Sequence, residues 1–414
     1  MNEREKTVYV YAGWGPGDPV LFGRLFLQRV RGKETASFSF SDGWLKKHGG
    51  SVFWGPSLSF YSGRQYATES APLFGIFSDS APDRWGRWLI RRREEMAAKK
   101  EGRRAERLEE SDYLLGVYDE TRMGGFRFSL QENGPFLSAD RELAAPPWAT
   151  LRTLESASLA LEGADGAEAE KWLRQLIAPG SSLGGARPKA SVEAPDGSLW
   201  IAKFPSRHDE SDSGAWEMTV RDLADECGLR VPEARLERFS ASGSTYLCAR
   251  FDRDGKERTQ FVSALSLLGK KDGDEASFLD IASFIRSYGQ SPARDLAELW
   301  QRIVFCIAVS DTDCHLRNHG FLLRDGAWQL APMYDVNPDR FGGRLALAID
   351  GTDGTPDFDL ALSVAKYFGL SETRASHMMR EIRKTVSARW RDTAGRYGIS
   401  RGEAERMAPA FALA

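Results

Sequence analysis

The 414-residue chain is 42% hydrophobic and 28% charged, and its formal net charge at pH 7 is −3. This composition excludes a disordered chain, and no apolar run reaches the roughly 18 residues that a membrane span needs. The near-neutral net charge argues against a protein that binds nucleic-acid backbones by itself, so any contact with DNA would be indirect, through a partner. The N-terminal run MNEREKTVYVYAGW lacks the basic-then-apolar order of a secretory signal, which favours a cytoplasmic protein with no membrane partner.

Several short elements are expected in the first 164 residues. Alternating runs (VYVYA, VLFGRLFL, SFSFS, SLSFY) between residues 8 and 60 predict a small antiparallel sheet. Residues 83–110 mix Arg and Lys with Glu, which favours a solvated helix face over a nucleic-acid patch. Residues 136–164, rich in Ala, Pro and Ser, predict a loose connection before a new unit.

A hairpin preceded by a glycine-bearing loop follows. Residues 177–189 (IAPGSSLGGARPK) lead into expected strands at 190–194 and 198–204, joined by the turn Pro-Asp-Gly. In the second strand, Leu199, Ile201 and Lys203 share one face, which places the Lys203 ammonium along an apolar wall. A snorkelling edge lysine is the alternative, and the glycine-bearing loop upstream and the acidic cluster downstream favour a phosphate-binding lysine. Glu217, on the next expected helix, is a candidate ion-pair partner for Lys203, and a solvated surface glutamate is the alternative.

A helix at 214–228 and strands at 235–239 and 245–251 come next, and the pattern is helical from about residue 276. Residues 296–309 are apolar nearly all round, as in a helix buried inside a domain. The polar segment SDTDCHLRNH at 310–319 ends this helix, and short strands at 320–323 and 328–330 lead to APMYDVNP at 331–338. The second hairpin should bring Asp335 back beside Asn318.

Phosphoryl transfer needs metal ligands, a carboxylate at the attacking hydroxyl and a cation on the phosphates. Asp313 and Asn318 have the D-x₄-N spacing of the protein-kinase catalytic loop, and Asp335 follows a hairpin as the kinase metal-binding Asp does. Asp311 and Asp313 alone would also suit glycoside hydrolysis, but no other feature supports sugar chemistry. His315 and His319 have a helical zinc spacing without an HExxH pattern, and the four cysteines lack C-x₂-C spacing, so zinc is not expected.

The segments SSLGGARPKAS, WIAKFPS, ARFDR, SDTDCHLRNHGF and APMYDVNP together resemble, in order and spacing, the HipA family of serine/threonine kinase toxins. The resemblance covers essentially the whole chain. It implies an α+β, two-lobed kinase-like fold with ATP between the lobes: a HipA-like N-terminal subdomain at 1–135, a β-rich kinase N-lobe at 136–255 and a helical C-lobe at 256–414. It also implies ATP and Mg²⁺ as cofactors and a protein substrate, an aminoacyl-tRNA synthetase in the best-known members.

The resemblance carries over to individual positions. Asp313 matches the catalytic base, and Asn318 and Asp335 match the Mg²⁺ ligands. Ser182 aligns with the autophosphorylated serine, with Ser181 as the alternative acceptor. The family's hinge is often acidic where this chain has Ala249. The implied nucleotide contacts are Gly184, Gly185, Ala186, Arg187, Lys189, Lys203, Ala249, Arg250, Phe251, His315, Asn318, Tyr334 and Asp335.

The family pattern further implies a HipB-like helix-turn-helix antitoxin that links the kinase to DNA. Two rival readings remain, an inactive kinase-like corepressor or scaffold and a kinase acting on a small molecule. Phosphate placed on Ser181 or Ser182 would compete with ATP for the donors of the loop, which gives autophosphorylation an inhibitory effect.

Overall fold

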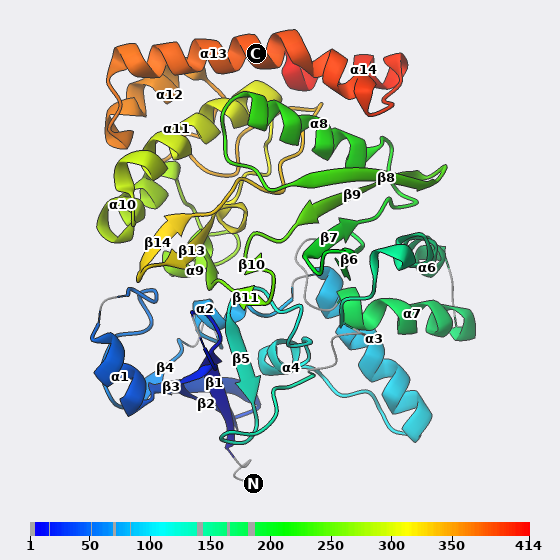
Figure 1. Cartoon of the computed structure of the whole chain (residues 1–414), viewed down its shortest axis with the longest axis vertical. Helices are drawn as coiled ribbons and strands as arrows, with labels where there is room; N and C mark the ends of the chain where they lie inside the picture. The colour runs from blue at the N-terminus through cyan, green and yellow to red at the C-terminus, as the bar shows by residue number, and fades with distance from the viewer. Residues whose placement is uncertain are drawn as a thin grey trace. The chain divides into compact units, whose positions relative to one another are not determined.

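The computed structural model describes residues 5–15, 17–50, 52–68, 72–82, 84–138, 144–163, 166–180 and 187–414 (Figure 1). The chain divides into two compact units. The first comprises Met1–Arg207 and Asp252–Val262, and the second comprises His208–Phe251 and Ser263–Ala414. These two units differ from the three parts expected from the sequence, with boundaries after residues 135 and 255. The three-part division stays a prediction.

An antiparallel sheet organises the beginning of the first unit. Its strand order is β4-β3-β2-β1-β5. Strand β2 turns into β3 through Arg31 and Gly32, both with positive φ, the backbone of a tight two-residue hairpin. The predicted sheet is therefore confirmed. Its strands are β1 (Lys6–Ala12), β2 (Val20–Val30), β3 (Lys33–Phe40), β4 (Gln65–Tyr66) and β5 (Phe126–Ser129).

The run SLSFY at 57–61, expected as a strand, is a loop. The side chain of Gln65 holds it there, because its amide oxygen accepts from the Ser59 N–H at 2.6 Å and its amide nitrogen donates to the Ser59 carbonyl at 2.8 Å. The partner of β3 is β4 instead, with Phe38 opposite Gln65. The alternation in SLSFY was misleading because Leu58 is buried as in a strand, although residues 57–61 form no strand with a neighbour.

Helices complete the first unit. Helix α3 buries Trp85, Leu89 and Ile90 and exposes charged residues, as predicted for a solvated helix. The expected loose connection at 136–164 is wrong over its second half, where α6 buries Leu151, Leu154 and Leu161 on one side. The helices are α1 (Asp42–His48), α2 (Gly75–Ser78), α3 (Arg84–Glu101), α4 (Glu110–Leu115), η1 (Trp148–Thr150), α6 (Leu151–Gly163) and α7 (Gly166–Gly180).

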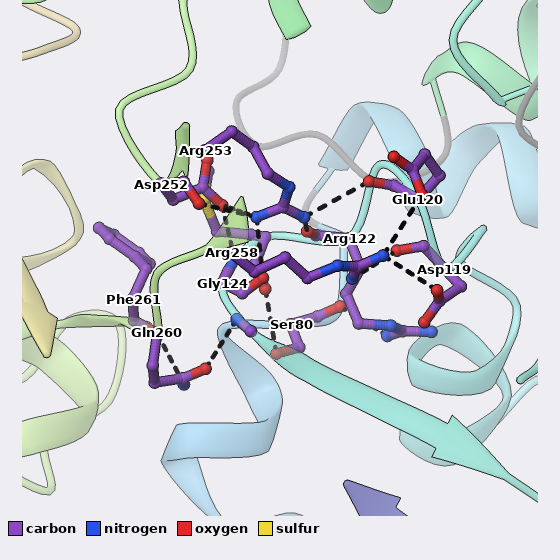
Figure 2. A network of polar contacts seen from close by, with 12 residues as sticks. Ser80, Asp119, Glu120, Arg122, Gly124, Asp252, Arg253, Arg258, Gln260 and Phe261 are labelled. Atoms are coloured by element: carbon purple, nitrogen blue, oxygen red, sulfur yellow. Dashed lines mark hydrogen bonds and ion pairs between the residues drawn. The ribbon is translucent and has the colours of Figure 1, made fainter. Parts of the chain in front are cut away.

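The later segment Asp252–Val262 is fastened to this unit by a buried polar network (Figure 2). It carries β10 (Arg253–Asp254) and β11 (Glu257–Arg258). The Arg258 guanidinium lies 3.0 Å from the Asp119 carboxylate, and Asp252 accepts a hydrogen bond of 2.8 Å from the Gly124 N–H. Burial acts to raise the pKa of Asp119, but the guanidinium groups of Arg258, Arg127 and Arg122 outweigh it and lower this pKa. Asp119 is therefore held as a carboxylate.

The second hairpin of the first unit follows the sequence prediction. Strand β6 (Lys189–Glu193) pairs with β7 (Leu199–Lys203), and Lys189 lies directly opposite Lys203. The connecting turn closes with a 2.9 Å hydrogen bond from the Gly197 N–H to the Ala194 carbonyl. Gly197 has φ +83°, which a glycine adopts without strain.

The second unit is mostly helical, as expected for the C-terminal part. Helix α11 is buried nearly all round, and α13 runs beside it in Figure 1. No helix among the described residues is long and apolar enough to cross a membrane. The elements are α8 (Ser213–Glu226), β8 (Ala234–Ser240), β9 (Gly243–Ala249), α9 (Ala264–Leu267), α10 (Phe278–Tyr288), α11 (Pro292–Val309), η2 (Leu316–Asn318), β13 (Gly320–Arg324), β14 (Ala327–Leu330), α12 (Phe358–Val364), η3 (Ala365–Phe368), α13 (Glu372–Arg396), α14 (Arg401–Met407) and η4 (Ala408–Phe411), and β12 (Phe261–Ser263) lies where the chain enters this unit for the second time.

Candidate active site

The end of α11 creates the polar loop of the site. Ser310 takes a left-handed backbone with φ +50°, and the Asp311 N–H donates to the Cys306 carbonyl at 2.9 Å. This left-handed cap stops the helix and turns the chain out of the core. The Asp313 side chain is consequently 85% exposed, whereas Asp311 is buried. Asp313, the predicted base, and Asp311 thus have opposite environments.

Asn318 joins the polar loop to the segment after the hairpin. Its amide nitrogen donates to the Asp313 carbonyl at 3.0 Å and to the Asp335 carbonyl at 3.5 Å. The antiparallel pair β13 and β14 returns the chain to this point, as the sequence predicted. Asp335 has φ +57°, a backbone that few residue types other than Gly, Asn and Asp adopt readily.

The oxygens of Asn318 and Asp335 suit a hard cation. Since the amide nitrogen of Asn318 takes the two carbonyl contacts, its amide oxygen faces the other way. Amide and carboxylate oxygens are ligands that Mg²⁺ accepts, usually from one or two side chains, with substrate phosphates and water completing the shell. Among the described residues no group of three or more His, Cys, Asp and Glu side chains could hold a metal. By ligand type, these two oxygens would suit Mg²⁺ held jointly with a phosphate ligand.

Asp311 is the buried carboxyl group of this loop. Burial raises the pKa of Asp311 to about 8, and the charges of Asp335 and Asp313 act in the same direction. The Cys306 thiol contacts its carboxylate, with Sγ 3.7 Å from Oδ2. Such a strongly perturbed carboxyl is typical of functional sites, although buried structural groups show it too.

The loop is also tied to residues beyond Asp335, which the sequence reasoning missed. The Thr312 hydroxyl donates to the Asp339 carboxylate at 2.8 Å, and the Asp339 N–H donates to the Ser310 carbonyl at 3.1 Å. An acidic residue four positions after Asp335 was the available signal, but its partner lies 27 residues away in sequence.

The residue before Asp335, Tyr334, contacts a second aromatic ring within the second unit. The rings of Phe251 and Tyr334 lie 5.4 Å apart, and the Tyr334 hydroxyl donates to the Arg317 carbonyl at 2.6 Å. Arg250 is buried, and Ala249 ends β9 with its N–H donating to the Glu233 carbonyl at 2.8 Å. The Ala249 N–H is therefore already engaged, and adenine recognition through that one group would require this bond to change.

The two histidines differ. His315 lies near the candidate base, with Nε2 4.0 Å from Asp313 Oδ1. His319 is buried against the ring of Phe278, and burial lowers its pKa to about 3, with Arg302 adding to the effect. His315 and His319 flank η2 and lie outside any α-helix, so they do not share the helix face on which their spacing would make a zinc pair.

Most of the remaining predicted residues belong to the first unit. Lys189 and Lys203 share one face of the hairpin, and the Arg187 Nε donates to the Phe204 carbonyl at 3.0 Å. Three cationic side chains thus gather at the open end of one hairpin. Glu217 is buried on α8 of the second unit, and its pairing with Lys203 stays a prediction. Ser181, Ser182, Gly184, Gly185 and Ala186 lie outside the described residues.

Comparison with known proteins decides the family. Residues 181–390, about half of the chain, match the model described as the HipA-like C-terminal domain. The chain belongs to the HipA-like family. HipA of Shewanella oneidensis MR-1, solved in a complex with HipB and operator DNA, has a similar fold, with a TM-score of 0.68 and 15% identity over 98% of this chain and 96% of that one. The predicted α+β, two-lobed kinase-like fold is confirmed by this likeness.

Two curated relatives are similar to this HipA-like chain. "Putative kinase Y4mE" of Sinorhizobium fredii is 28% identical over 255 residues, which cover 52% of this chain and 58% of the relative. A "Putative kinase" of Haemophilus influenzae is 26% identical over 134 residues, 29% of this chain and 39% of the relative. The chain therefore matches about half the length, or less, of these relatives.

Proposed function

We propose that this HipA-like protein is an ATP- and Mg²⁺-dependent serine/threonine protein kinase. The observation that carries the proposal is the position of Asn318, whose amide nitrogen bonds the carbonyls of both Asp313 and Asp335. These bonds link the Asn318 side chain to the backbone of the candidate base and of the other candidate ligand, which supports assigning the three residues to one phosphoryl-transfer site. The names of the relatives and the family membership support the same activity.

Each residue then has a defined task. The exposed carboxylate of Asp313 can approach a substrate hydroxyl and accept its proton as the hydroxyl oxygen attacks the γ-phosphorus. The bond from that phosphorus to the β,γ-bridging oxygen breaks in the same transfer, and ADP leaves. Asn318 and Asp335 would hold Mg²⁺, which offsets the negative charge on the phosphates when bound. In the first unit Lys203, Lys189 and Arg187 would contact the non-transferred phosphates. Autophosphorylation at Ser182 or Ser181 would reduce activity by competing for these cations.

We also propose the biological setting that the family pattern implied. The protein would be the toxin of a toxin–antitoxin pair, restrained by a HipB-like DNA-binding antitoxin in the cytoplasm. Its substrate would be a translation-related protein such as an aminoacyl-tRNA synthetase. The similar HipA of Shewanella oneidensis was solved with HipB and operator DNA, which supports an antitoxin partner of that kind.

The test is incubation of the dephosphorylated full chain with Mg²⁺ and labelled ATP, followed by mass spectrometry. Wild type should label Ser181 or Ser182, and Asp313→Asn should not. The matched control is Asp325→Asn, which alters an exposed carboxylate in the β13–β14 turn of the same unit and should label as wild type does. Binding of Mg-ATP by wild type without any phosphate transfer would instead indicate the inactive scaffold.

A further inference from the structure

The hairpin of β6 and β7, proposed to bind phosphate, is hydrogen-bonded to a distant part of the chain. The indole N–H of Trp85, on α3, donates to the backbone carbonyl of Lys189 at 2.9 Å, and this contact is buried. The two residues are 104 positions apart. Lys189 is the first residue of β6 and lies opposite Lys203 in the register. The bond therefore acts at the register position where Lys189 and Lys203 lie opposite each other.

Helix α3 is itself fixed independently of the hairpin. Arg87 forms two parallel hydrogen bonds of 2.6 Å to the carboxylate of Glu110 on α4, and its Nε donates to the Pro82 carbonyl at 2.9 Å. Bidentate pairs of this kind fix geometry as well as adding energy. Trp85, two residues before Arg87, thus projects from a helix that the N-terminal part of the unit holds in place.

The same helix also supports the chain ahead of the hairpin. Helix α7 packs against both α3 and β6, and it ends at residue 180. Helix α3 is therefore connected to the hairpin in two ways, through α7 and through the Trp85 bond to Lys189.

We propose that Trp85 is a positioning residue for the phosphates of ATP, acting through Lys189 and the hairpin end that also carries Lys203 and Arg187. This inference rests on the proposed kinase function and assigns a task to the N-terminal part, which otherwise contributes no chemistry. If the lysines are already held rigidly, less conformational entropy is lost when they bind a polyphosphate, so the affinity is higher. Removal of the indole N–H should weaken binding of the phosphates and leave binding of the nucleoside unchanged.

The experiment compares Trp85→Phe with Trp88→Phe in the full chain. Trp88 lies one turn further along α3 with its ring stacked on Trp85 at a centroid distance of 5.4 Å, so both variants lose the same atoms from the same stack. The dissociation constants of Mg-ATP and of adenosine are measured, the latter by competition with labelled ATP. Trp85→Phe should raise the constant for ATP about threefold to tenfold, the scale of one buried hydrogen bond, and leave that for adenosine unchanged.

The other outcomes are also decisive. Equal weakening of ATP and adenosine, or equal effects of the two variants, would show that Trp85 has only a structural role and would overturn the inference. Wild type that binds no ATP would overturn the proposed function, and the inference with it. A melting temperature for both variants, measured without nucleotide, separates loss of folding from loss of phosphate binding.

Discussion

The Thr312 hydroxyl donates to the Asp339 carboxylate at 2.8 Å, which joins the residue before the candidate base to the segment that follows the candidate metal ligand. The Asp339 carboxylate also accepts from the Phe341 N–H at 2.9 Å, so a single side chain orders both segments. Phe341 itself is 83% exposed beside them. This pair makes the position of Asp313 dependent on residues well outside the loop.

Loss of the Thr312 hydroxyl should therefore slow catalysis more than it weakens nucleotide binding. In Thr312→Val we expect kcat to fall about fivefold, the effect of one hydrogen bond worth about 1 kcal/mol, with the dissociation constant of Mg-ATP nearly unchanged. The matched control is Thr355→Val, which removes a similar Thr–Asp bond of 2.7 Å in the same unit. Equal kinetics in the two variants would contradict a positioning role for Thr312.

The metal site can be tested with two aspartates that share one backbone conformation. Asp335 and Asp325 have φ values of +57° and +49°, and asparagine tolerates both positions. Asp335→Asn replaces an anionic ligand with a neutral amide, so the Mg²⁺ concentration for half-maximal ATP binding should rise about tenfold or more. Asp325→Asn should not change it. A titration of ATP binding against Mg²⁺ measures both, and an unchanged midpoint in Asp335→Asn would exclude it as a ligand.

The Asp119 network should make the stability of the first unit depend on pH. Because the folded pKa of Asp119 lies below its ordinary value of 3.8, its contribution is fully present above that value and is lost as the pH falls through the folded pKa. Asp119→Asn leaves buried guanidinium groups without their carboxylate, so at pH 7 we expect a loss of about 3–5 kcal/mol.

Urea denaturation at pH 7 and pH 3 tests this expectation, because the difference between wild type and Asp119→Asn should shrink at the lower pH. The control is Glu132→Gln, whose carboxylate pairs with Arg24 at the surface and should change stability by less than about 1 kcal/mol. A difference between wild type and Asp119→Asn that stays constant with pH would show that the effect does not come from ionisation.

Gly23 is predicted to be indispensable to the N-terminal sheet. A Cβ at this position would lie 2.3 Å from the Ser39 carbonyl oxygen and 2.4 Å from the ring of Phe38. Gly23→Ala must displace backbone or a buried ring, and we expect a loss of about 1–3 kcal/mol in urea denaturation. Gly43→Ala is the control, since nothing lies within 4 Å of its added methyl group. Equal stability of the two variants would indicate that β2 and β3 separate at little cost.

The sequence alone determined the parts of this protein that are local. The spacing of Asp313 and Asn318, the hairpin returning to Asp335, and the strand that carries Lys203 all depend on patterns of a few residues, and for these local periodicity and turn chemistry are informative. The run at 57–61 shows the limit of that reasoning. Apolar and polar residues do alternate there, but the backbone of Ser59 bonds the Gln65 side chain and not a neighbouring strand.

Only the tertiary structure decided which aspartate is exposed and which residues support the site. Asp311 and Asp313 are two positions apart, and the left-handed cap at Ser310 buries one and presents the other. The bonds from Thr312 to Asp339 and from Trp85 to Lys189 join residues 27 and 104 positions apart. Such pairs leave no periodic trace in the sequence, because each partner satisfies its local pattern equally well without the other.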